Sequence, residues 1–177
     1  MLPASVEYLH LREGPGAVFE IDLPDKRLPN LHTLIFNDCR WLCTAVLATF
    51  LFIAEPPLRI LRVEECFNIH MEDLRPVLKD ELPHNQQISK ITELGLVHVS
   101  GVDDEVAREL FTMFPELKVL DLTRTEITGI TIRMFADARA SGSDEGANLD
   151  FLIVRCCDDI SSDAVAYGRE RGLEVIT

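Results

Sequence analysis

Five cysteines and five histidines are the side chains of this 177-residue chain best suited to carry chemistry. Cys39 and Cys43 lie four residues apart, but Cys43 begins an apolar segment, which favours packed thiols over metal ligands. Cys156 and Cys157 are adjacent, so on a strand one points inward and the other outward. An outward Cys156 leaves a redox-sensing or enzymatic role open. The histidines share no metal-ligand spacing; they are His10, His32, His70, His84 and His98.

Common catalytic motifs are absent from the sequence. It contains no glycine-rich phosphate loop and no HExxH, CxxC or GxSxG motif. The acidic pairs Asp103-Asp104 and Asp158-Asp159 stand at predicted helix starts, where carboxylates interact favourably with the helix dipole. We therefore expect a protein that is not an enzyme and that has no catalytic, cofactor-binding or metal-binding residues.

A nine-residue pattern recurs along the chain and predicts the elements that position these side chains. Aliphatic residues usually occupy its first, fourth and sixth positions, and cysteine or another small residue usually occupies the ninth. Successive copies begin 25, 27, 33, 26, 32 and 24 residues apart, a period typical of repeat proteins. The complete copies begin at Val6, Leu31, Leu58, Ile91, Leu117 and Leu149, and a partial copy begins at Leu173.

Each copy predicts one strand followed by one helix. Apolar and variable residues alternate in the segment 119–123 (VLDLT), which is the period of a strand with one buried face. Asp103, Thr128 and Ser161 are candidate helix N-caps, and apolar residues at helical spacing follow them. Because a helix separates successive strands, we expect parallel strands with helices on the outer face of an open arc. The predicted fold is an α/β solenoid of about six repeats.

The pattern resembles leucine-rich repeats of the cysteine-containing type, best known from F-box/leucine-rich-repeat proteins. The resemblance rests on strand patterns that end in Cys39, Cys66 and Cys157, and on segments such as 157–165 (CDDISSDAV). It covers nearly the whole chain, although no F-box-like helical segment precedes the repeats. The resemblance implies a right-handed superhelix with its strands on a concave face. It also implies recognition of substrates for an F-box-type ubiquitin ligase.

Composition and charge limit the partners that this chain is expected to bind. With 177 residues and 47% hydrophobic residues, we expect one domain over residues 1–177. The formal net charge of −13 repels phosphate groups, so we expect no nucleic acid and favour a protein partner with a basic surface. The apolar segment 41–54 is shorter than the roughly 20 residues that span a bilayer, so we expect no membrane contact.

The cysteines and the start of the chain predict where the protein resides. Three of the five cysteines occupy buried repeat positions, where a thiol acts as a small hydrophobic group. Residues 1–10 do not form a secretory signal. We therefore expect a reducing compartment, either the cytoplasm or the nucleus.

Three segments depart from the repeat. Segment 14–30 is too rich in proline for a full helix, segment 80–90 (DELPHNQQISK) is predicted to be a polar insertion, and segment 139–148 (RASGSDEGAN) a mobile loop. The last two account for the long steps of 33 and 32 residues. Both chain ends fall inside repeat units, which predicts uncapped solenoid ends through which the chain could associate.

Function is expected on the strand face opposite the helices, which solenoid proteins use for binding. Strand alternation directs Glu93 and Thr123 toward this face. It also predicts a line of apolar side chains across the face, the apolar trace, formed by Tyr8, Ile60, Val119 and Phe151. The leading hypothesis is a protein-interaction module, the alternative is a structural subunit of a larger complex, and the third is chemistry at Cys156 and Cys157. Strand alternation assigns these partner-binding residues: Tyr8, His10, Arg12, Ile35, Asn37, Ile60, Arg62, Glu64, Val97, His98, Val119, Asp121, Phe151, Ile153 and Arg155.

Overall fold

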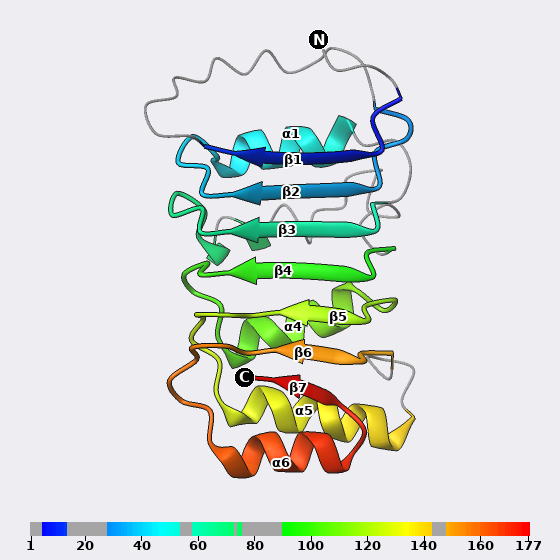
Figure 1. Cartoon of the computed structure of the whole chain (residues 1–177), viewed down its shortest axis with the longest axis vertical. Helices are drawn as coiled ribbons and strands as arrows, with labels where there is room; N and C mark the ends of the chain where they lie inside the picture. Colours follow the sequence, from blue (N-terminus) through cyan, green and yellow to red (C-terminus); the bar gives the residue numbers. More distant parts are fainter. Residues whose placement is uncertain (1–4, 14–27, 54–57, 73, 76–89, 143–147) are drawn as a thin grey trace.

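Seven short strands form one all-parallel sheet in which each strand lies beside its neighbours in sequence (Figure 1). The computed structural model describes residues 5–13, 28–53, 58–72, 74–75, 90–142 and 148–177. Each strand lies within one copy of the nine-residue sequence pattern, where the alternation of apolar residues predicts a strand. The strands are β1 (Tyr8–Arg12), β2 (Thr33–Asn37), β3 (Ile60–Glu64), β4 (Glu93–Val97), β5 (Val119–Asp121), β6 (Phe151–Ile153) and β7 (Glu174–Ile176).

The described residues also form four helices, which connect strands in the order expected. They are α1 (Thr44–Ile53), α4 (Asp104–Met113), α5 (Gly129–Ser141) and α6 (Ser162–Glu170). In Figure 1, α1 and α4 pass behind the strands, while the sheet faces the viewer. The fold is therefore α/β with an open parallel sheet.

The predicted N-caps are confirmed at three helices. At α4 the carboxylate of Asp103 accepts a hydrogen bond from the N–H of Val106 at 2.9 Å, and Thr128 and Ser161 have the equivalent role at α5 and α6. Each cap satisfies an amide that the first helical turn leaves without a partner. The start of each of these three helices is thus fixed by a short polar side chain.

The prediction of a loop from residue 139 to 148 is wrong at its beginning. Helix α5 continues through Arg139 to Ser141 and ends at Gly142, whose φ of 61° is left-handed. Arg139 stays helical because its guanidinium donates to the carbonyl of Leu149 at 2.7 Å, which ties the last turn to the next unit. Glycine adopts the left-handed conformation without a steric penalty, so it ends the helix there.

Within the described residues, a hydrophobic core lies between the sheet and its helices. Alternate strand residues and the inward side chains of the helices are buried together in it. The buried repeat cysteines take part as hydrogen-bond donors, because Cys39 donates to the carbonyl of Leu11 and Cys157 to that of Leu122, each at 3.2 Å. A hydrogen bond with Cys39, together with burial, raises the pKa of the Cys66 thiol. These thiols are therefore packing groups, as predicted.

Each of the strands β2 to β6 is followed, within three residues, by one residue with a left-handed backbone, although none of the five is glycine. Their φ angles lie between 50° and 56°, in a region that most side chains avoid. The N–H of each of the first four donates to a carbonyl of the following repeat copy at 2.9 Å, which extends the sheet's hydrogen bonds. We call them the turn residues; they are Asp38, Glu65, His98, Arg124 and Cys156.

Some predicted features lie outside the described residues. These are the proline-rich segment over residues 14–27, the insertion over 80–89 and the central part of the loop, 143–147. Within the described part of the chain, no helix is both long and apolar enough to cross a membrane.

Candidate functional site on the open face of the sheet

Strand register arranges the side chains of the open sheet face in rows. The open face is the one whose side chains alternate with the buried strand residues. The first row runs from Tyr8 through Ile60, Glu93 and Val119 to Phe151. The second and third rows run parallel to it. The second contains His10, Ile35, Arg62, Gly95, Asp121 and Ile153, and the third contains Arg12, Asn37, Glu64 and Val97.

Large apolar side chains are exposed near both ends of the first row. Tyr8 is 55% exposed and Phe151 is 44% exposed, whereas Ile60 and Val119 between them are half-buried. The predicted apolar trace is present, but buried Thr33 and half-buried Glu93 interrupt it. Exposed aromatic residues on a sheet face are typical anchors for a protein partner.

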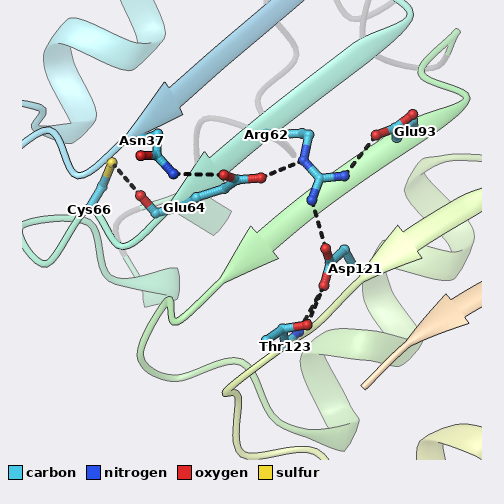
Figure 2. Close-up of polar contacts among 7 residues, drawn as sticks. All are labelled: Asn37, Arg62, Glu64, Cys66, Glu93, Asp121 and Thr123. Carbon is cyan, nitrogen blue, oxygen red and sulfur yellow. Dashed lines mark hydrogen bonds and ion pairs between the residues drawn. The ribbon is translucent and has the colours of Figure 1, made fainter. Parts of the chain in front are cut away.

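An arginine with three carboxylate partners occupies the centre of the open face (Figure 2). Arg62 on β3 donates through Nε to Glu64 at 2.5 Å, through Nη1 to Glu93 at 2.7 Å and through Nη2 to Asp121 at 2.7 Å. These contacts join β3, β4 and β5, because each carboxylate is held by its strand at a fixed register. We call these four residues the Arg62 cluster.

A glycine gives Arg62 the room to reach across β4. A Cβ atom at Gly95 would lie 3.1 Å from Cγ and 3.3 Å from Cζ of Arg62. The guanidinium therefore passes over the backbone of β4 and reaches Asp121 on β5. A glycine inside a strand often marks such a close approach.

Further hydrogen bonds fix the carboxylates of the Arg62 cluster. The side-chain amide of Asn37 donates to Oε2 of Glu64 at 2.8 Å. Oδ1 of Asp121 accepts from both the N–H and the hydroxyl of Thr123, at 3.1 and 2.7 Å. These hydrogen bonds connect the Arg62 cluster to Asn37 on β2 and to Thr123, which follows β5.

Burial strengthens the electrostatic interactions within the Arg62 cluster. The side chains of Arg62 and Asp121 are 19% and 9% exposed. Burial alone would lower the pKa of Arg62, but the hydrogen bonds that its guanidinium donates to Glu64 and Glu93 outweigh burial and raise the pKa. The guanidinium therefore stays charged, and its attraction to the carboxylates acts in a region with little water.

A cavity of about 550 Å³ lies at the carboxyl ends of β4, β5 and β6. The residues that line it include buried Val99 and Ile127 and exposed Cys156, the predicted outward cysteine. The pair Asp158-Asp159 also lines it, because these residues precede the N-cap of α6 and lie outside the helix. Among the described residues, no three His, Cys, Asp or Glu side chains form a group that could hold a metal ion.

Most predicted face residues lie in the rows, but two lie beyond the strand ends. His98 is an exposed turn residue, and its ring packs edge-on against that of Phe67, with 5.1 Å between the ring centroids. Arg155 is exposed and follows β6. Arg62 and Asp121 lie on the face as predicted, but their charged groups contact each other. Sequence reasoning missed Gly95, whose signal was a glycine at a strand position where a side chain is the norm.

The comparisons with known proteins give no family for this chain. No protein-family model matches it, and no curated protein matches it in sequence. Any functional assignment therefore rests on the residues, their register and their exposure.

Proposed function

We propose that this chain is a leucine-rich-repeat solenoid that binds a protein partner on the open face of its sheet and performs no chemistry of its own. The strands follow one another in chain order, and small buried residues follow most of them, which supports the repeat assignment. The resemblance to the repeats of F-box/leucine-rich-repeat proteins makes substrate recognition for a ubiquitin ligase the proposed setting.

The observation that carries this proposal is the exposure of aromatic side chains on an ordered, polar-centred face. Tyr8 and Phe151 are both exposed on the first row, and the Arg62 cluster lies between them in chain order. Protein interfaces combine aromatic anchors with arginine and a polar surround. The face offers both within one parallel sheet.

Affinity capture from native cells tests the proposal when it compares variants of two surfaces. Tyr8→Ser combined with Phe151→Ser removes the aromatic groups of the open face. Ile130→Ser is the matched control, because Ile130 is 58% exposed but lies on α5. Quantitative mass spectrometry then compares the proteins retained by each variant with those retained by the wild type.

We expect the wild type and Ile130→Ser to retain the same partner, and the double variant to lose it. An identical set of proteins on all three baits would contradict the proposal. Loss of the partner only with Ile130→Ser would show that the interface lies on the helices. It would favour the alternative hypothesis, in which the chain is a structural subunit of a larger complex. Circular dichroism of each variant separates lost binding from lost folding.

A further inference from the structure

The Arg62 cluster carries more negative charge than its single arginine neutralises. Three carboxylates at −1 each and one guanidinium at +1 leave a formal charge of −2 on the open face. The carboxylate side chains are between 9% and 29% exposed, so water solvates them only in part. Charge that is partly removed from water and incompletely paired is costly, and an added cation would lower that cost.

The hydrogen bonds identify where a cation can be received. Both oxygens of Glu64 and both oxygens of Asp121 already accept hydrogen bonds. Oε1 of Glu93 accepts from Arg62, but Oε2 has no partner among the described residues. Glu93 is therefore the member of the cluster with an oxygen available to a ligand.

Apolar residues flank Glu93 along the first row. Ile60 on β3 and Val119 on β5 are its partners in register, and exposed Phe151 follows on β6. Neighbouring strands lie about 4.8 Å apart, so these side chains are within roughly 10 Å of Glu93. A ligand that fits here has one cationic group and apolar groups close beside it.

We infer that the open face receives a partner segment in which a lysine or arginine, with aliphatic or aromatic neighbours, places its charged group beside Glu93. This inference rests on the proposed function and specifies the chemistry of the partner. The aliphatic stem of a lysine or arginine packs on apolar surface while its charged end reaches a polar group. The apolar neighbours would then contact Ile60, Val119 and Phe151.

A bound metal ion does not fit this place as well as a basic side chain does. Calcium and magnesium need several oxygen ligands each. Within the cluster, the oxygens of Glu64 and Asp121 are held by Arg62, Asn37 and Thr123, which leaves one carboxylate oxygen of Glu93. One available oxygen matches one ammonium or guanidinium group.

Selection of peptides from a random dodecamer library displayed on phage tests the inference with a defined probe. The immobilised wild-type chain is the target, and selected peptides are synthesised with a fluorescent label for anisotropy titrations. Glu93→Gln removes the charge but keeps an oxygen for Arg62. Glu170→Gln is the control, because it removes one charge from an exposed residue of α6.

We expect the selected peptides to share a lysine or arginine next to aliphatic or aromatic residues. Glu93→Gln should weaken their binding at least about tenfold, which corresponds to one charge-assisted contact, and Glu170→Gln should leave it unchanged. Binding should also weaken as salt is added. Selected peptides without a basic residue, an empty selection, or equal binding by Glu93→Gln would each overturn the inference.

Phe151→Ser separates this inference from the proposed function. If Phe151→Ser abolishes peptide binding while Glu93→Gln does not, the open face binds partners but not through a cation at Glu93. If neither variant weakens binding, the peptides bind elsewhere, and the proposed function fails together with the inference.

Discussion

Replacing Arg62 with methionine should destabilise the protein more than any other single change to the open face. Methionine keeps an unbranched apolar stem over Gly95 but removes all three hydrogen bonds to carboxylates. It leaves Glu64, Glu93 and Asp121 facing one another without a counter-charge. The variant therefore tests whether the cluster holds β3, β4 and β5 together.

The expected loss follows from the burial of the cluster. Removing one partner of a buried ion pair costs about 3–5 kcal/mol, because it leaves uncompensated charge. Water can rehydrate Glu64 and Glu93, which are 20% and 29% exposed, but it reaches Asp121 poorly at 9%. We therefore expect a loss of about 3 kcal/mol in the free energy of unfolding. For a chain of this size that lowers Tm by roughly 6–12 °C.

Urea unfolding followed by circular dichroism measures this loss at two salt concentrations. Because salt screens both the original ion pairs and the new repulsion, the gap between variant and wild type should narrow between about 0.1 M and about 1 M salt. Arg108→Met is the matched control, since Arg108 is exposed on α4 and its replacement changes the net charge equally. It should cost no more than about 0.5 kcal/mol.

Two results would refute this reasoning. If Arg62→Met unfolds within about 0.5 kcal/mol of the wild type, the cluster contributes no net stability, as some ion pairs do not. If the variant is unstable but the gap does not change with salt, its instability comes from packing and not from unpaired charge.

Two further predictions concern single positions. Gly95→Ala places a methyl group against the Arg62 side chain and should cost about 1–2 kcal/mol in urea unfolding, as overpacking does; in an Arg62→Met background the cost should shrink, and an unchanged cost would place the strain elsewhere. Burial would raise the pKa of Asp104, but hydrogen bonds from Thr131 and Thr128 outweigh it and lower the pKa below its usual value. The wild type should therefore lose this stabilisation as pH falls through the lowered pKa, so Asp104→Asn should cost more at neutral pH than in acid, and a cost independent of pH would contradict the assignment.

Alternation of apolar residues was enough to predict the strands, because each short strand has one buried face. Residues 119–123 alternate, and β5 lies there with Leu120 buried and Val119 on the open face. The caps were predictable for a similar reason, since Asp103 and Thr128 act on amides two or three residues away. Local chemistry therefore determined these features.

The Arg62 cluster could not be predicted, because it depends on register between distant residues. Arg62 and Asp121 are 59 residues apart, and they meet only because β4 places Gly95 between them. Strand alternation assigned both residues to the open face but could not show that they contact each other. The continuation of α5 to Ser141 was missed likewise, because Arg139 is anchored by a carbonyl of the next unit.

The turn residues have a consequence for protein engineering. The backbone amides of the first four donate to a carbonyl of the following unit, while the side chains of all five differ in size, charge and reactivity. Randomising these five positions would therefore create a library of variants that share one scaffold. Glycine at any of them would remove the steric cost of the left-handed backbone. These positions should accept many different side chains, because the main chain makes the contact with the following unit.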